Sequence, residues 1–131
     1  MPRAASATWS DITRSLGAFG ETFAAHALEK RGYRILDRNV RLPSGEIDIV
    51  AREQNQLVFV EVKTRRGNTF ALPEDAISDE RMSHLEAAVD EYFDARGLAT
   101  GEPYRIEIVA IELDRSGRVS RFEIIGDVGL R

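Results

Sequence analysis

The sequence predicts an α/β protein whose central β-sheet carries a helix on each face. Apolar residues recur at helical spacing in two segments, 15–31 and 79–96, and strand-like runs lie between and after them. The run 45–63 has apolar residues on both sides, so we expect a central hairpin covered on each face by part of a helix. At 131 residues the chain has room for one core, and we expect one domain over 15–131 behind a loose arm over 1–14.

The elements are expected in the order helix, three strands, helix, two strands. The first helix ends at Gly32, and the first strand, over 33–41, leads through a turn with Pro and Gly into the hairpin. Three antiparallel strands in succession make a meander. After a polar, basic loop over 64–68, the second helix begins at the N-cap Ser78 and ends at Gly97. Two strands close the chain, over 104–113 and 119–125.

The hairpin carries four charged residues that need an explanation. If its turn is centred within 53–56, Asp48 lies opposite Glu61 and Glu46 lies opposite Lys63. Alternation along strands then places these four side chains on one face. The other face is expected to hold Ile47, Ile49, Ala51, Val58, Val60 and Val62.

Opposed carboxylates on neighbouring strands repel each other. Directly opposite residues have Cβ atoms about 4.5–5.5 Å apart, so Asp48 and Glu61 would weaken the sheet unless a positive charge lies between them. A divalent cation such as Mg²⁺ binds carboxylate oxygens, and Lys63 would then stabilise anionic charge beside it. The alternatives are a cross-strand salt bridge between Glu46 and Lys63, and two carboxylates that are solvated or share a proton.

Composition limits the kind of site. The chain has no cysteine, and His26 and His84 lie on helices without acidic partners at ligand spacing, so a bound metal must be held mainly by oxygen. The net charge of −4 argues against a broad basic surface for nucleic acid. Residues 1–73 nevertheless hold 11 Lys or Arg against 8 Asp or Glu, which leaves room for a local phosphate-facing surface.

The sequence shows no run of residues typical of a membrane span or a secretory signal. No apolar run approaches the length of a membrane span, and the first residues lack the apolar core of a secretory signal. We therefore expect a cytoplasmic protein without a membrane partner.

Several blocks of the sequence resemble a known family. Asp48, followed after twelve residues by Glu61, Val62 and Lys63, resembles the PD-(D/E)xK nuclease superfamily, which includes restriction endonucleases and Holliday-junction resolvases. More closely, the chain resembles the YraN family of small bacterial proteins. The blocks that carry this likeness are GE at 20–21, EKRGYRIL at 29–36, GEIDIVA at 45–51 and LVFVEVKTR at 57–65.

The resemblance implies a restriction endonuclease-like αβββαβ core with a mixed central sheet. It implies that Glu21, Asp48, Glu61 and Lys63 correspond to nuclease positions, with Mg²⁺ or Mn²⁺ bound by the three acids and Lys63 positioning or activating water. The Val62 carbonyl is a candidate extra oxygen. Glu46 is expected to be an auxiliary group.

Arginines near the hairpin are the candidates for contacts with nucleic acid, expected to be DNA. They are Arg41, Arg65, Arg66 and Arg81. The YraN family commonly has a basic Lys-Gln segment at the start of the second helix, where this chain has an acidic start with Asp79 and Glu80, and Arg81 alone keeps a positive charge.

The leading interpretation is a metal-dependent nuclease acting on DNA, with branched or damaged structures as candidate substrates, and a homodimer would suit a substrate with two strands to cut. The alternatives are a non-catalytic module that binds nucleic acid or a protein partner, and an inert relative with a salt-bridge ladder.

Overall fold

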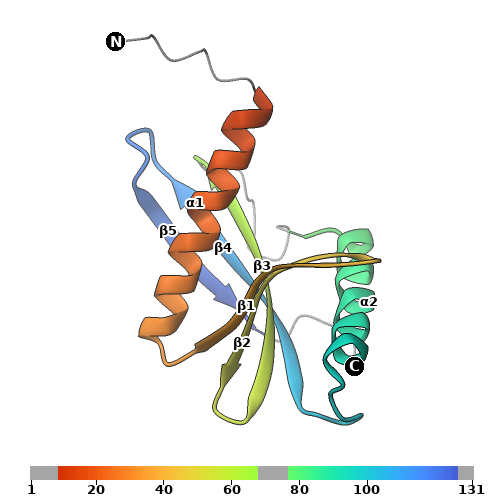
Figure 1. Cartoon of the computed structure of the whole chain (residues 1–131). Helices are drawn as coiled ribbons and strands as arrows, with labels where there is room; N and C mark the ends of the chain where they lie inside the picture. Colours follow the sequence, from red (N-terminus) through yellow and green to blue (C-terminus); the bar gives the residue numbers. More distant parts are fainter. Residues whose placement is uncertain (1–8, 68–76, 127–131) are drawn as a thin grey trace, which may run out of the picture.

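The structure is a computed structural model that describes residues 9–67 and 77–126, with side chains from residue 16 onward. Two helices and five strands follow one another in the expected order, helix, three strands, helix, two strands (Figure 1). The elements are α1 (Trp9–Lys30), β1 (Arg34–Leu42), β2 (Gly45–Glu53), β3 (Gln56–Arg66), α2 (Asp79–Arg96), β4 (Tyr104–Leu113) and β5 (Val119–Ile125). The predicted αβββαβ core is therefore confirmed.

Two predicted boundaries are wrong. Helix α1 begins at Trp9 instead of Ser15, so residues 9–14 of the expected arm are helical, and residues 1–8 lie outside the described part. Trp9, Ile12 and Leu16 already recur at helical spacing, which supports the longer helix. Strand β3 continues to Arg66 instead of ending at residue 63, because β4 pairs with it as far as Arg66.

The sheet is mixed, as predicted, with strand order β1-β2-β3-β4-β5. Strands β1, β2 and β3 form the antiparallel meander, and β4 pairs with β5 in the same antiparallel sense. Strand β4 runs parallel to β3, with Thr64 opposite Ile111 and Arg66 opposite Leu113. A parallel pair requires a crossover connection, and α2 lies on that connection.

The hairpin of β2 and β3 has the predicted register. Gln54 and Asn55 form the two-residue turn, and Gln54 takes a left-handed conformation with φ of 56°. Glu53 pairs with Gln56, and the ladder continues to Ile49 opposite Val60. This register carries Asp48 and Glu61 toward the same point, although regular pairing is recorded only as far as Ile49.

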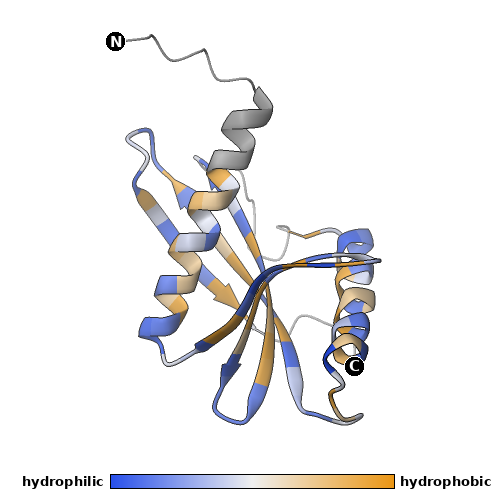
Figure 2. Cartoon of the chain, in the orientation of Figure 1, coloured by the Kyte–Doolittle hydropathy of each residue, from blue (hydrophilic) through white to orange (hydrophobic). Residues whose placement is uncertain are grey.

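Each face of the sheet has its own apolar core, which confirms the prediction of a helix on each side (Figure 1, Figure 2). Helix α1 packs on one face through Ala24, Ala25 and Leu28. Helix α2 packs on the other through Leu85, Ala88, Val89 and Tyr92. The sheet residues buried against α1 are Ile49, Ala51, Val58, Val60, Val109, Ile111 and Leu113, and those against α2 are Ile47, Val50, Leu57, Phe59 and Ile106.

The predicted face assignment is wrong at Ile47. Its side chain belongs to the α2 core, whereas Ile49 belongs to the α1 core, although strict alternation would put both on one side. The irregularity lies at Asp48, and its neighbour on β1, Asn39, has a φ of 53°. Strand β2 therefore changes the face that its side chains occupy at the point where its acids lie.

Helix α2 has the predicted caps. The Ser78 hydroxyl accepts a hydrogen bond from the Arg81 backbone N–H at 3.1 Å. Gly97 is left-handed with φ of 62°, and its N–H reaches the carbonyls of Asp94 and Phe93. The start of α2, and with it the backbone position of Arg81, is therefore fixed.

In the described part of the chain, neither helix is long and apolar enough to cross a membrane.

Candidate metal and phosphodiester site

The candidate site lies where β2 and β3 separate. At this point the Asp48 Oδ2 accepts a hydrogen bond from the Val62 backbone N–H at 2.8 Å. The side chain thus takes the place of a carbonyl from the partner strand. Because a buried N–H needs an acceptor, this bond fixes Asp48 in the gap between the strands.

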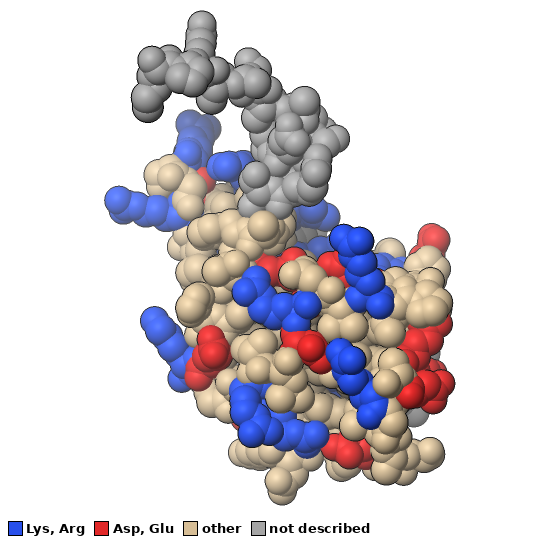
Figure 3. All heavy atoms as spheres, in the orientation of Figure 1, with Lys and Arg blue, Asp and Glu red and all other residues tan. Residues whose placement is uncertain are grey.

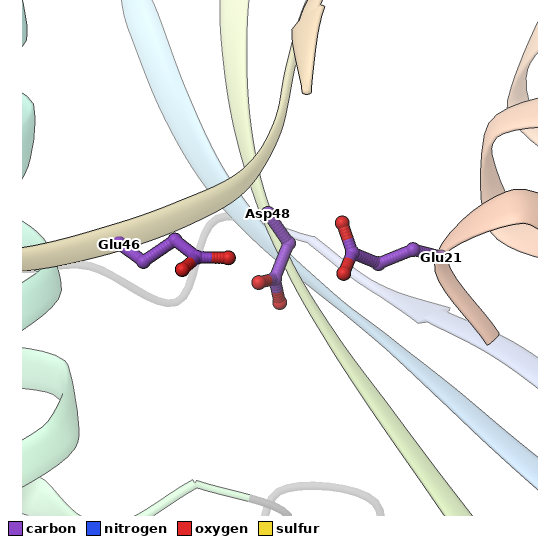
Figure 4. Close-up of side chains that lie close together, drawn as sticks. All are labelled: Glu21, Glu46 and Asp48. Atoms are coloured by element: carbon purple, nitrogen blue, oxygen red, sulfur yellow. The ribbon is translucent and has the colours of Figure 1, made fainter. Parts of the chain in front are cut away.

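Three carboxylates converge at this gap. One oxygen from each of Glu21, Glu46 and Asp48 lies within 4.8 Å of the other two. Glu21 reaches in from α1, while Glu46 and Asp48 come from β2, and the outer two point toward Asp48 from opposite sides (Figure 4). All three residues are half-buried.

Glycine at position 20 allows α1 to lie this close to the sheet. A Cβ built on Gly20 would overlap the Thr64 Oγ1 and lie 3.0 Å from the Thr64 Cβ. Since Glu21 is the next residue, the close approach of helix and strand delivers its carboxylate to the gap.

Asn39, which sequence reasoning missed, joins two of the acids. With its amide oriented to satisfy its neighbours, the nitrogen donates to the two Glu21 oxygens at 2.7 Å and 3.0 Å, and to Glu46 Oε1 at 3.2 Å. Asn39 has a left-handed backbone, which Asn tolerates better than most residues. The signal available in the sequence was therefore an Asn inside a run that otherwise predicts a strand.

Glu61 forms a second group with two cations. It is 3% exposed, and the Arg81 guanidinium binds it in a fork, Nε to Oε2 and Nη2 to Oε1, both at 2.8 Å. Lys63 Nζ lies 3.8 Å from Glu61 Oε2. Glu46 pairs with Arg41 at 3.8 Å, so the predicted salt bridge between Glu46 and Lys63 is replaced by two others.

Crowding of the acids changes their proton affinity. Burial, followed by the charge of Glu61 and partly offset by the Val62 N–H, raises the pKa of Asp48 to about 8. Burial and then the charge of Glu46 raise the pKa of Glu21, while Arg38 opposes this. Carboxylates this close are stable in ionised form only when a cation joins them.

The donor set fits a hard divalent ion. All the convergent groups are carboxylate oxygens, and such oxygens are the ligands that Mg²⁺ and Mn²⁺ take. Asp48 lies against both groups, so Glu21, Glu46 and Asp48, together with Glu61, are the residues that would hold the ion. Glu46, predicted as an auxiliary group, thus becomes a candidate ligand.

The predicted nucleic-acid contacts differ in their surroundings. Arg41, Arg65 and Arg66 are exposed, whereas Arg81 is engaged by Glu61 and by the Glu46 carbonyl at 2.8 Å. On the face drawn in Figure 3, acidic side chains lie among Lys and Arg side chains. The role of these four arginines stays a prediction.

Comparison with known proteins identifies the family. The model of the uncharacterised protein family UPF0102 matches residues 20–125. The chain belongs to family UPF0102. The predicted resemblance is therefore confirmed, and the UPF0102 match begins at Gly20 and spans every residue of the site from Glu21 to Arg81.

Similar proteins cover most of the chain. A UPF0102 protein of Moorella thermoacetica is 44% identical over 112 residues, which is 86% of this chain and 92% of that protein. A UPF0102 protein of Caldicellulosiruptor saccharolyticus is 43% identical and covers 86% of this chain and 94% of its own length. A UPF0102 protein of Roseiflexus castenholzii is 45% identical over 75% of this chain and 79% of its own.

Among solved structures, SfsA of Pyrococcus furiosus in complex with Ca²⁺ aligns with 91% of this chain at a TM-score of 0.42 and 18% identity. The chain spans 65% of that protein, just under two thirds of its length.

Proposed function

We propose that this protein is a metal-dependent nuclease that hydrolyses DNA phosphodiester bonds, with branched and damaged DNA as the candidate substrates. The observation that carries the proposal is the convergence of Glu21, Glu46 and Asp48 at the gap between β2 and β3, with Glu61 next to Asp48 and Lys63 next to Glu61. Burial of so many acids at one point costs stability, and a cation used in catalysis gives a reason for it.

Each residue has a role in this proposal. Asp48, Glu61 and Glu21 would hold Mg²⁺ or Mn²⁺, and Glu46, whose carboxylate lies close to those of Glu21 and Asp48, would be a further ligand. The metal supplies a Lewis acid for the phosphoryl oxygens and an activated water. The Lys63 ammonium, next to Glu61, positions the attacking water and offsets the negative charge that develops on the phosphate.

The chain offers a matched control for the central test. Purified protein is incubated with branched, single-stranded and duplex DNA in Mg²⁺ or Mn²⁺. We expect wild type to cleave at least one of these, Lys63→Ala and Asp48→Ala to lose cleavage by about a hundredfold or more, and Lys30→Ala to retain it. Lys30 is an exposed lysine in the last turn of α1, outside the site. Equal cleavage by wild type, Lys63→Ala and Asp48→Ala would refute the assignment.

A second candidate is a nucleic-acid- or partner-binding module that keeps the nuclease scaffold without turnover. The fork between Arg81 and Glu61 favours it, because both Glu61 oxygens are already bound, and so does the acidic first turn of α2. Calorimetric titration with Mn²⁺ separates the two. A wild type that binds no divalent ion but binds DNA in a salt-sensitive way is the module.

A further inference from the structure

We propose that Arg81 is the resident counter-cation of this site, that it shields Glu61 until a divalent ion enters, and that it thereby sets the affinity for the metal. This inference rests on the proposed metal site. It assigns to Arg81 a positioning role toward the acids, in addition to the contact with nucleic acid that the sequence suggests.

Arg81 forms a hydrogen bond with each carboxylate oxygen of Glu61. The guanidinium donates to both carboxylate oxygens at 2.8 Å, and its Nη2 also donates to the Glu46 carbonyl at 2.8 Å. The Glu61 side chain is 4% exposed and that of Arg81 is 26% exposed. A bidentate, charge-assisted pair with this little solvent is among the stronger polar contacts in proteins.

Removal of Arg81 would leave the buried Glu61 with Lys63 as its cation among the described residues, at the longer distance of 3.8 Å. The arginine therefore stabilises the metal-free fold, because a buried carboxylate without a close partner is costly. The same attraction opposes metal binding. An ion that takes an oxygen of Glu61 must open one N–H···O bond of the fork or share its oxygen.

The origin of Arg81 makes the exchange feasible. It stands in the first turn of α2, where the Ser78 cap holds its backbone N–H at 3.1 Å. The cap keeps the Arg81 backbone close to the acids, so a guanidinium displaced from Glu61 remains within reach of the site, where its planar fork can bind a phosphate oxygen pair. The metal and Arg81 thus compete for Glu61, and binding of the metal would release the Arg81 guanidinium to bind a phosphate of the substrate.

A merely structural Arg81 predicts a different outcome. If the pair only fastens α2 to β3, Arg81→Gln lowers stability and leaves metal affinity unchanged or weaker. If Arg81 competes with the metal, the same variant loses stability without metal and gains metal affinity. Metal affinity is therefore the deciding measurement.

The test is calorimetric titration of the full chain with Mn²⁺ alone at about pH 8, where proton competition is reduced. We expect Arg81→Gln to bind Mn²⁺ about tenfold tighter than wild type, since a bond to a charged group contributes roughly a factor of ten. Arg81→Lys, which keeps the charge but loses the fork, should fall between them. Arg96→Gln is the matched control. Arg96 also lies on α2, and its Nη2 pairs with Asp37 Oδ2 at a distance of 3.0 Å, outside the acidic site. We expect it to match wild type.

A thermal melt with and without Mn²⁺ checks the same point independently. Arg81→Gln should melt lower than wild type without metal and gain more from Mn²⁺. If Arg81→Gln does not fold, Arg81→Lys decides through the same titration. Binding by wild type with no gain in the folded Arg81 variants overturns this inference and leaves the metal site standing. Absence of binding in wild type and variants overturns the metal site and this inference together.

Discussion

Replacement of Asp48 by Asn should make the protein more stable at neutral pH. The raised pKa of about 8, against an ordinary value of 3.8, means that folded Asp48 holds a proton that the unfolded chain releases. A carboxyl group of this kind weakens the fold as pH rises from 3.8 toward 8, because the folded state binds more protons in that window. Asn resembles the protonated form: its oxygen accepts from the Val62 N–H, and its amide donates toward Glu61.

The size of the stability difference follows from the pH range between the ordinary pKa of Asp48, 3.8, and its raised pKa of about 8. Each pH unit inside it lowers the wild-type free energy of unfolding by about 1.4 kcal/mol, so the step from about pH 5 to about pH 7 costs about 2.7 kcal/mol. Structural relaxation around the buried Asp48 reduces this, and we expect a measured difference of about 1–3 kcal/mol between Asp48→Asn and wild type over that step.

The assay is urea unfolding in a chelator at both pH values, followed by circular dichroism. Asp90→Asn serves as the control, because Asp90 is an exposed acid on α2 and its replacement changes the net charge equally. That control should follow the wild-type pH dependence. The raised Glu21 pKa adds a slope to all three proteins and cancels in the comparison. Parallel curves for wild type and Asp48→Asn would show that the buried-acid reasoning is wrong.

Three further tests concern the framework of the site and of the sheet beside it, by chemical unfolding and, for Asn39, by Mn²⁺ titration as well. Gly20→Ala should cost about 1–3 kcal/mol through overlap with Thr64, and Thr64→Ala in the same chain should recover about 1 kcal/mol or more; additive effects would contradict the close approach. Glycine adopts a left-handed backbone readily and alanine does not, so Asn39→Ala should be less stable than Asn39→Gly by about 1–2 kcal/mol. Both variants lose the amide that donates to Glu21 and Glu46, so the affinity for Mn²⁺ should fall in both. Tyr33→Phe should cost about 1–2 kcal/mol, because its hydroxyl donates to buried Glu107 at 2.8 Å; no change would mean that the bond is not formed.

Local patterns were sufficient for most of the fold. The polar turn fixed the hairpin register, Ser78 and Gly97 marked the ends of α2, and alternation placed most apolar side chains on their correct face. The first helix was predicted to begin only at Ser15 because small and polar residues dominate before it, although Trp9 and Ile12 lie at helical spacing with Leu16. The end of β3 was missed because polar Thr64 to Arg66 looks like a loop until β4 pairs with it.

The arrangement of the site depended on contacts between distant segments. The exchange of faces at Asp48 breaks the strict alternation on which the prediction rested, and no spacing within the hairpin reveals it. The fork on Glu61 comes from Arg81, which belongs to another element and reaches the hairpin only after α2 has packed. The sequence therefore identified Asp48, Glu61 and Lys63 as neighbours, whereas the alternative of a salt bridge between Lys63 and Glu46 is not formed, because Lys63 lies near Glu61.

Asp48 is the carboxylate that joins the two charged groups of the site. It belongs with Glu21 and Glu46 on one side, and its raised pKa reflects the adjacent Glu61 on the other. Glu61 is paired with Arg81, whereas the first group has, among the described residues, Arg38, Arg41 and the Asn39 amide at its edge. An entering divalent ion would therefore gain most from the first group and reach Glu61 through Asp48. For this reason the loss of Asp48 should abolish metal binding, while the loss of Glu46 alone should only weaken it.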